Sequence, residues 1–193
     1  TIHHEWAWKN STTMGSSTLN YVTSIAYEKF PFPNLLKNKL NELLDDFGST
    51  YVAQQTALTD LLQLGLTDLY NQFHNKDLVQ KVQPIEAKSF EKKFGKETWN
   101  LYNHLEVKKA GNISYPEAVS LIEKFRALHK EMDEVVLAAY SWEDINMCHD
   151  FYEMEYLPEN DRVRYTIHPE ARKEVLKRLL LLNHKIHEEE LAA

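Results

Sequence analysis

After residue 33, apolar residues recur along the chain at spacings of three and four, which places them on one face of an α-helix. The pattern predicts a helix over residues 34–47 that ends at Gly48, where the run of apolar residues stops. A second helix is predicted over residues 50–64, and Gly65 separates it from a short third helix. The second helix is expected to bury one side, made of Ala53, Ala57, Leu61 and Leu64. The short helix should carry Leu69, Tyr70 and Phe73.

The clearest start of a helix lies at Ser114. Ser114 and Glu117, three residues later, form a capping box around Pro116, and proline is favoured in the first turn of a helix. This predicts a helix that runs to about Tyr140. Its apolar face is expected to hold Val119, Ile122, Phe125 or Leu128, Met132, Val135, Val136 and Ala139. Before it, residues 84–112 predict one or two short helices that bury Phe90, Phe94, Trp99 and Leu105.

Both ends of the chain have a different pattern. Residues 1–32 lack a helical stripe and contain a short strand-like run over 19–22. An irregular acidic stretch follows Trp142, and the alternating run over 162–167 predicts a strand. Pro169 then opens a last helix, lined on one side by Val175, Leu176, Leu179, Leu180 and Ile186.

These elements predict a mainly α fold. We expect a helical domain over residues 34–193 and a small irregular or β-containing part over residues 1–33. The chain has 193 residues, of which 43% are hydrophobic and 26% charged, as in an ordinary globular protein. No apolar run approaches the roughly 20 residues needed to cross a bilayer, and no charged leader followed by an apolar run appears. A single cysteine, Cys148, excludes an internal disulfide and favours a reducing cytoplasm. The start at Thr1, beside several aromatics, suggests a cut through a longer protein.

The net charge of −7 argues at first against a partner as acidic as DNA. The acidity is concentrated in residues 116–193, which hold 17 acidic and 10 basic groups, whereas residues 84–115 hold 6 basic and 4 acidic groups. From Glu131 to Asp161 there are ten Asp or Glu and no Lys or Arg. Any contact with DNA is therefore expected from the first half of the chain.

Several groups could in principle hold a metal ion or a nucleophile, and for each the ordinary structural interpretation is favoured. Glu86 and Lys88 match half of a nuclease pattern, but the same spacing is common on helix surfaces. His184 and His187 are three residues apart, whereas zinc pairs on helices are usually four apart. The adjacent pair His3-His4, the run Cys148-His149-Asp150 and the acidic stretch 131–161 are also expected to be structural. No catalytic residue and no metal site is predicted.

The aromatic and polar residues near the N-terminus leave two interpretations open. Core packing is favoured for most of the aromatics, which are Trp6, Trp8, Tyr21, Tyr27, Phe30 and Phe32. The Ser/Thr-rich run over 11–18, together with Lys9, suits contacts with phosphates and base edges. An ordinary polar surface loop would have the same composition.

Four stretches together resemble the C-terminal part of class I adenine-N6 DNA methyltransferases and of single-chain type II restriction–modification enzymes. The first ends a target-recognition region, with His4-Glu5-Trp6-Ala7-Trp8-Lys9-Asn10-Ser11-Thr12-Thr13-Met14, Ser17-Thr18-Leu19-Asn20-Tyr21 and Phe30-Pro31-Phe32-Pro33. The second is Gly65-Leu66-Thr67-Asp68-Leu69-Tyr70-Asn71-Gln72-Phe73-His74. The third runs over residues 132–142 and ends Ala139-Tyr140-Ser141-Trp142, with Ser141 where the family usually has Gly. The fourth covers residues 171–180 with Leu182-Asn183-His184. Residues 84–115 look like an insertion.

The resemblance implies a parent enzyme that methylates adenine N6 with S-adenosylmethionine and is often fused to a nuclease. The cofactor-binding glycine-rich turn and the catalytic Asn-Pro-Pro-Tyr motif would lie in an upstream domain, because this chain has no adjacent prolines and no two glycines two residues apart. It also implies that double-stranded DNA lies at or near these residues: Lys9, Asn10, Ser11, Thr12, Ser17, Thr18, Asn20 and Tyr21. The helices after residue 33 would brace the recognition region or clamp the duplex.

Two other functions compete with this prediction. The chain could be a helical protein-interaction module that recruits a partner subunit without contacting DNA, which the net charge favours. A metal-dependent hydrolase would have only the scattered histidines and acidic residues in its support.

Overall fold

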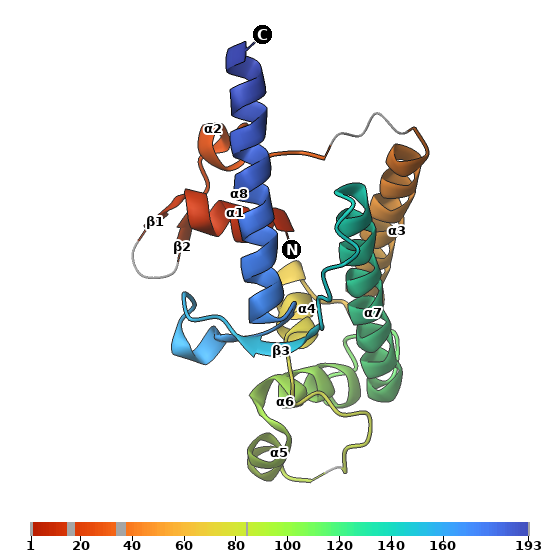
Figure 1. Ribbon diagram of the computed structural model, residues 1–193. Helices are drawn as coiled ribbons and strands as arrows, with labels where there is room; N and C mark the ends of the chain where they lie inside the picture. Colours follow the sequence, from red (N-terminus) through yellow and green to blue (C-terminus); the bar gives the residue numbers. More distant parts are fainter. Residues whose placement is uncertain (1, 15–17, 34–37, 84, 193) are drawn as a thin grey trace. The chain divides into compact units, whose positions relative to one another are not determined.

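The computed structural model describes residues 2–14, 18–33, 38–83 and 85–192 (Figure 1). The chain forms two compact units. We call them the terminal unit, Thr1–Asn41 with Asp133–Ala193, and the central unit, Glu42–Met132. The fold is mainly α, as predicted, with two small antiparallel hairpins. Two long helices, α3 (Asn38–Leu62) and α7 (Tyr115–Ala139), contribute residues to both units.

In the central unit, α3 is one helix where two were predicted. It continues through Gly48, which is exposed and has no atom within 4 Å of the position that a Cβ would take. A single glycine costs a helix only about 0.5–1 kcal/mol relative to alanine, too little to end a helix of this length. The predicted inner face was wrong as well. Leu58 and Leu62 are buried and Tyr51 is half-buried, whereas Ala53 and Ala57 are exposed and Leu61 is 37% exposed.

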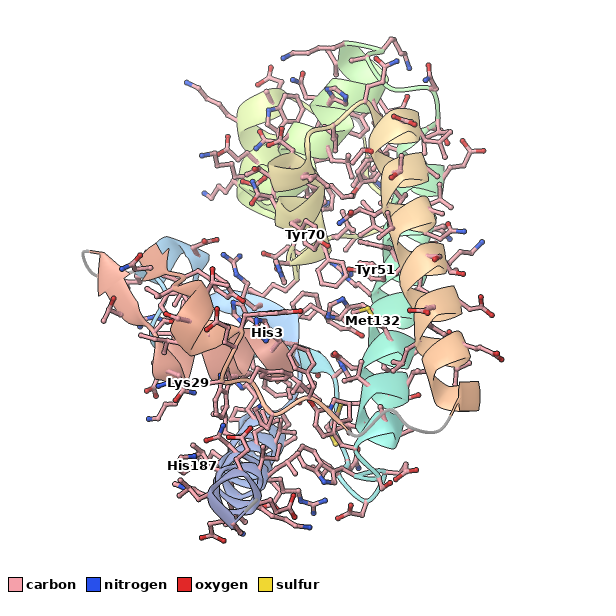
Figure 2. The ribbon with its side chains drawn as sticks, turned by 90° about the horizontal axis from the view of Figure 1, so that it is seen from above. His3, Lys29, Tyr51, Tyr70, Met132 and His187 are labelled. Carbon is pink, nitrogen blue, oxygen red and sulfur yellow. The ribbon has the colours of Figure 1, made fainter. Side chains whose placement is uncertain are left out.

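The short helix after Gly65 is confirmed. Gly65 takes an extended conformation at the N-cap of α4 (Leu66–Phe73), and Leu69 and Phe73 are buried. The hydroxyl groups of Tyr51 and Tyr70 face each other from α3 and α4 at 3.1 Å (Figure 2).

Residues 85–112 contain two short helices, where the sequence predicted one or two. These are α5 (Ala87–Phe94) and α6 (Lys96–Tyr102), and one turn of π-helix follows at Asn103–Val107. Phe90 and Leu105 are buried, whereas Phe94 and Trp99 are only half-buried. Gly95 joins α5 to α6 with φ +85°, a backbone conformation that residues with a Cβ rarely adopt.

The predicted start of α7 is confirmed, together with the half of the capping box that Glu117 contributes. The Glu117 carboxylate accepts hydrogen bonds from the backbone N–H of Ser114 at 3.0 Å and from its hydroxyl at 2.6 Å. Val119, Ile122 and Phe125 are buried, as predicted. Further along α7, the Arg126 guanidinium donates to three carbonyl oxygens at the end of α4, those of Gln72, Phe73 and Asn75.

In the terminal unit, the first residues form a helix that the sequence pattern did not predict. Helix α1 (Ile2–Asn10) buries Ile2, Glu5, Trp6 and Ala7. A charged residue is among the buried ones and Trp8 lies half-buried elsewhere on the helix, so no regular apolar stripe stands out in the sequence. The hairpin of β1 (Thr12–Met14) and β2 (Thr18–Asn20) follows, and then the short helix α2 (Thr23–Ala26). The predicted strand over 19–22 thus overlaps β2.

The acidic stretch after Trp142 also holds a strand that was not predicted. In this stretch, β3 (Asp150–Glu153) pairs with β4 (Val163–Thr166), and only β4 was predicted. A 3-10 turn at Glu159–Asp161 lies between the two strands. The last helix, α8 (Pro169–Ala192), begins at Pro169 as predicted. It buries Ala171, Arg172, Val175 and Leu179. The prediction that Leu180 lies on the buried side was wrong, because Leu180 is 38% exposed.

One apolar core holds the terminal unit together. Its buried members are Ile2, Trp6, Phe30, Leu137, Ile145, Met147, Ile167, Ala171, Val175 and Leu179, with Val136, Tyr140 and Trp142 packed against them. Segments from both ends of the chain therefore share a single core. Among the described residues, none of the helices combines the length and the apolar composition that crossing a bilayer requires.

Candidate nucleic-acid interface

Six of the eight residues implied to lie near DNA are described with their side chains, and they lie close together along the chain. Lys9 and Asn10 end α1, Thr12 starts β1, Asn20 ends β2 and Tyr21 follows it, while Ser11 joins α1 to the hairpin. The register Thr12↔Asn20 brings the two ends of the hairpin side by side. The described members of this set can therefore lie on one surface. Ser17 lies outside the described residues, and of Thr18 the structure describes only the pairing with Met14.

Side-chain hydrogen bonds fix this region. The Asn10 amide donates to the carbonyl oxygen of Trp6 at 2.9 Å, and the Asn20 amide donates to the hydroxyl of Thr12 at 3.2 Å. Because Lys9, Thr12 and Asn20 are exposed, their remaining donors and acceptors can reach a ligand. Ser11 differs, since its hydroxyl oxygen is buried without a hydrogen-bond partner among the described residues.

Aromatic side chains border the hairpin. The Tyr21 hydroxyl lies 2.9 Å from Nε2 of His3, and the His3 ring meets that of Phe30 edge-on at 4.7 Å. Burial lowers the pKa of His3, which favours its neutral form. Tyr21, Tyr27 and Phe32 remain 45–52% exposed, so that aromatic faces lie open beside the polar hairpin.

The charge around the hairpin is more favourable to an anionic ligand than the net charge suggests. Residues 1–27 contain one acidic residue, Glu5, and one basic residue, Lys9. Glu5 is only 6% exposed, whereas Lys9 is exposed. The surface formed by these residues therefore presents a cation without a competing carboxylate of its own.

A buried polar cluster connects α1 to α8. Arg172 lies 4.0 Å from the Glu5 carboxylate and donates to the sulfur of Met154. The Tyr156 hydroxyl is buried in the same cluster, and burial raises the pKa of Tyr156. The Tyr156 ring also packs against that of Trp8 at 4.5 Å. The sequence did not predict this cluster, because its members come from segments about 150 residues apart.

Three of the stretches that carry the resemblance meet at one place in the terminal unit. The Tyr140 hydroxyl donates to the carbonyl oxygen of Pro31 at 3.0 Å, and the Asn183 amide donates to that of Lys29 at 2.8 Å. Burial raises the pKa of Tyr140, which keeps its hydroxyl protonated as a donor. The chain that leaves the hairpin is thus held by the end of α7 and by α8.

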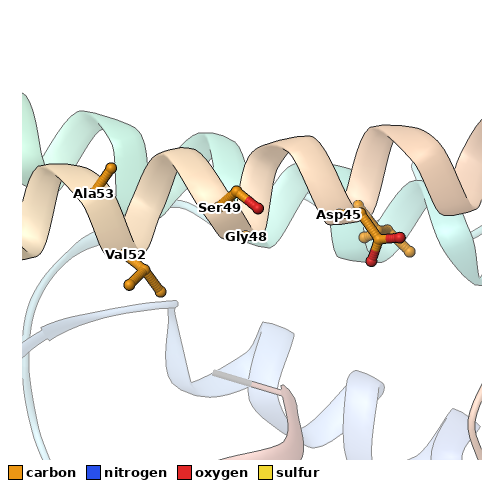
Figure 3. A pocket seen from close by; sticks show the side chains of 6 residues that line it. Asp45, Gly48, Ser49, Val52 and Ala53 are labelled. Atoms are coloured by element: carbon orange, nitrogen blue, oxygen red, sulfur yellow. The ribbon is translucent and has the colours of Figure 1, made fainter.

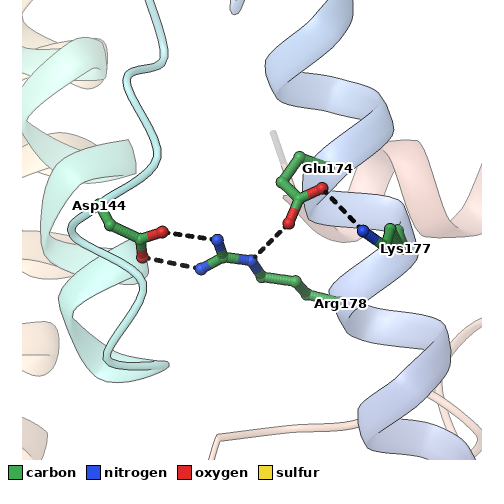
Figure 4. Close-up of polar contacts among 4 residues, drawn as sticks. All are labelled: Asp144, Glu174, Lys177 and Arg178. Carbon is green, nitrogen blue, oxygen red and sulfur yellow. Dashed lines mark hydrogen bonds and ion pairs between the residues drawn. The ribbon is translucent and has the colours of Figure 1, made fainter.

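A charged network ties α8 to the loop after α7 (Figure 4). The Arg178 guanidinium makes two hydrogen bonds with Asp144, at 2.8 and 2.6 Å, and a third with Glu174 at 2.9 Å. These bonds hold the pKa of Asp144 below its usual range and raise that of Arg178. The two parallel bonds fix the direction of the guanidinium, which lies 5.9 Å from the ring centre of Trp142.

His149 and Asp133 form a buried pair that sequence reasoning missed. Nε2 of His149 lies 2.9 Å from the Asp133 carboxylate, and the two side chains are 1% and 2% exposed. Nδ1 of His149 is buried and has no hydrogen-bond partner among the described residues. Because both side chains are almost completely buried, the pair suits a structural role better than a site that must admit a substrate. Across the part of the chain that the structure describes, no group of three or more His, Cys, Asp or Glu is arranged to hold a metal ion.

Hollows in the described part of the central unit do not form an active site. One is a shallow depression along α3, lined by Leu44, Asp45, Gly48, Ser49, Val52 and Ala53 (Figure 3). The other, of about 230 Å³, is lined by mixed polar groups that include Asp68, Glu97, His104 and Lys108. The Nε2 atom of His104 already lies 2.8 Å from the carbonyl oxygen of Leu62, and neither hollow brings together a set of reacting groups.

Comparison of the chain with protein-family models, with curated proteins and with solved structures found no match.

Proposed function

We propose that this chain is the DNA-recognition and bracing segment of an adenine-N6 DNA methyltransferase, or of a methyltransferase–restriction enzyme. S-adenosylmethionine and the methyl-transfer centre would belong to an upstream domain of the same polypeptide, and double-stranded DNA would lie along the hairpin of β1 and β2. The observation that carries the proposal is the convergence of three of the four resemblance stretches on one core, with the hairpin attached to it.

Recognition of a base edge requires that the contacting groups be held in place, because hydrogen bonds discriminate only when their geometry is fixed. Trp6 and Ile2 anchor the helix that leads into the hairpin, and Phe30 anchors the segment that leaves it. The exposed Lys9 suits a phosphate, and the exposed amide of Asn20 suits a base edge or a sugar–phosphate oxygen. This division of roles supports a braced recognition loop.

A first test uses the intact parent enzyme with labelled S-adenosylmethionine and duplex DNA of mixed sequence. The variants Lys9→Gln and Asn20→Ala should lose affinity for DNA or change the choice of methylated sites while the protein stays folded. Lys173→Gln is the matched control, because Lys173 is an exposed lysine of the same unit that already pairs with Glu170 at 2.7 Å. Unchanged site choice and affinity in both hairpin variants would refute the proposal.

A second candidate function, recruitment of a protein partner without DNA, has one observation in its favour. Leu181 in the middle of α8 and Leu191 near its end are 61% and 76% exposed, and a partner subunit could cover these apolar side chains. Replacement of both with Gln should abolish binding of a partner subunit if this function is the correct one. Methylation and site choice should stay unaffected by the same change if the DNA-recognition proposal is correct.

A further inference from the structure

A cluster of four lysines lies on α5 and at the start of α6, inside the inserted residues to which the resemblance assigns no role. Lys88, Lys92 and Lys93 belong to α5, and Lys96 is the first residue of α6. All four are exposed, and Glu91 is the one acidic residue between Lys88 and Lys96. A local charge of +3 over nine residues contrasts with the −7 of the whole chain.

The aromatic side of α5 fixes the direction in which these lysines point. Phe90 is completely buried, and its ring packs against Phe94 at 4.8 Å, Trp99 at 5.3 Å and Tyr102 at 4.8 Å. Phe90 and Phe94 are four residues apart and share one face of the helix, as do Lys88 and Lys92 on the opposite face. Packing of the phenylalanines therefore holds the lysines toward solvent.

The four lysines differ from other lysines of the described chain in their ion pairing. Among the described residues, none of them lies within ion-pair distance of an Asp or Glu, whereas Lys109, Lys173 and Lys177 each lie within 3.5 Å of a glutamate. Lys93 lies over the ring of Phe94, 5.0 Å from its centre. The positive charge of this surface is thus not neutralised within the protein.

Stability of the helices does not account for the cluster. A cation is favourable in the last turn of a helix, which explains Lys92 and Lys93, but it is unfavourable in the first turn. Lys88 lies in the first turn of α5 and Lys96 in the first turn of α6. Two of the four lysines therefore sit where the helix dipole opposes them, so helix stability does not explain their presence.

We propose that Lys88, Lys92, Lys93 and Lys96 form a second DNA-binding surface, which holds the phosphate backbone of the duplex without reading its sequence. The inference rests on the proposed function in taking duplex DNA as the ligand. Lysine ammonium groups are flexible point charges that bind phosphates well, and they lack the planar geometry with which arginine reads base edges. The surface contributes affinity, and the hairpin contributes the choice of site.

The test measures binding of the full chain to a labelled mixed-sequence duplex by fluorescence anisotropy over a range of KCl concentrations. The variant Lys88→Gln/Lys92→Gln/Lys93→Gln/Lys96→Gln should flatten the plot of log K against log salt by about 0.9 for each phosphate that the protein no longer neutralises, in total about 2–4. Its affinity should fall about tenfold or more at low salt, equally for all sequences. Glutamine keeps the helix propensity of lysine, and circular dichroism checks that α5 still forms.

A control variant removes the same charge elsewhere. Lys76, Lys173, Lys177 and Lys185 each have a carboxylate partner, and their replacement with Gln should leave the slope unchanged. A slope for the α5–α6 variant equal to that of the wild type overturns the inference, as does an equal flattening in the control.

The hairpin variant Lys9→Gln/Asn20→Ala separates this inference from the proposed function. If it alone weakens binding, the proposed function stands and the second surface does not exist. If only the α5–α6 variant weakens binding, the second surface stands and the hairpin proposal falls. Absence of any duplex binding by the wild-type chain overturns the inference. Lysine-dependent binding of polyglutamate in place of the duplex also overturns it, and identifies an acidic protein as the better ligand.

Discussion

Tyr140 and Pro31, which are separated by 109 residues, are joined by a hydrogen bond of 3.0 Å from the phenolic hydroxyl to the carbonyl oxygen. A proline has no N–H, so its carbonyl is its one backbone group that can form a hydrogen bond. The bond holds the segment that follows the hairpin of β1 and β2. Its donor, Tyr140, is the first residue after α7. Local order around the hairpin thus depends on a residue from the other end of the unit.

Tyr140→Phe removes this bond and keeps the ring. We expect the free energy of unfolding to fall by about 0.5–1.5 kcal/mol, because the carbonyl of Pro31 loses its donor in a half-buried position. Urea unfolding followed by tryptophan fluorescence measures the change. Tyr27→Phe is the control, since Tyr27 is 52% exposed and its hydroxyl has no hydrogen-bond partner among the described residues. Equal stability of Tyr140→Phe and the wild type would contradict the prediction.

The buried pair of His149 and Asp133 should couple the loop after Trp142 to α7. Asp133→Ala leaves the His149 ring buried beside an empty position, and we expect a loss of about 1–3 kcal/mol in the free energy of unfolding. Glu131→Ala, at an exposed position on the same helix, should change it by less than about 0.5 kcal/mol.

A double-mutant cycle with His149→Ala isolates the pair itself. The coupling energy should be about 0.5–3 kcal/mol, because the two side chains are in direct contact. Additive effects of the two substitutions would show that each residue stabilises the unit through other neighbours.

Acid should destabilise the central unit through the start of α7. The Glu117 carboxylate accepts hydrogen bonds from both the hydroxyl and the N–H of Ser114. The Glu106 carboxylate accepts hydrogen bonds from Lys109 and from the N–H of Tyr115. These bonds hold both pKa values below the ordinary 4.5. The unfolded chain therefore takes up protons first as the pH falls, so the stabilisation is present above 4.5 and is lost below it, toward the folded pKa values.

Glu106→Gln/Glu117→Gln should reduce the fall in the urea midpoint between about pH 5.5 and about pH 3, because glutamine keeps an acceptor but has no carboxylate to protonate. Glu91→Gln, at an exposed position on α5 without a side-chain partner among the described residues, should leave that fall as in the wild type. Parallel curves for the double variant and the wild type would exclude this origin of the acid sensitivity.

Elements with local signals could be predicted from the sequence. The helix start at Ser114, the break at Gly65 and the opening of α8 at Pro169 each depend on residues within one turn, and all three are confirmed. β3 could not be predicted in the same way. Its four residues gain their conformation from pairing with β4, and no periodicity marks a strand that is only partly buried.

The residues of the candidate interface were named through the resemblance. The structure describes the hydrogen bonds and the strand pairing that fix their positions. That Lys9, Thr12 and Asn20 could share a surface required the register of the hairpin, which three-residue strands do not reveal in a sequence. The contact between Glu5 and Arg172 joins α1 to α8 across most of the chain, and no local pattern indicates it. Their role in bracing stays a proposal until the variants are measured.

Gly48 and Gly111 should respond in opposite directions to the same substitution. Gly48 lies in the middle of α3 with open space at its Cβ position, so Gly48→Ala should raise the free energy of unfolding by about 0.5–1 kcal/mol. At Gly111 a Cβ would run into the buried side chain of Leu105 and lie 3.2 Å from the carbonyl oxygen of Leu62.

Gly111→Ala should therefore lower the free energy of unfolding by about 1–3 kcal/mol. The backbone N–H of the next residue, Asn112, donates to the carbonyl of Leu61 at 2.9 Å, so the loop cannot move away from the end of α3 without breaking that bond. Thermal and urea unfolding of the two variants in parallel measures both signs. A loss of stability in Gly48→Ala would mean that α3 does not continue through Gly48, and it would restore the two shorter helices that the sequence pattern predicts.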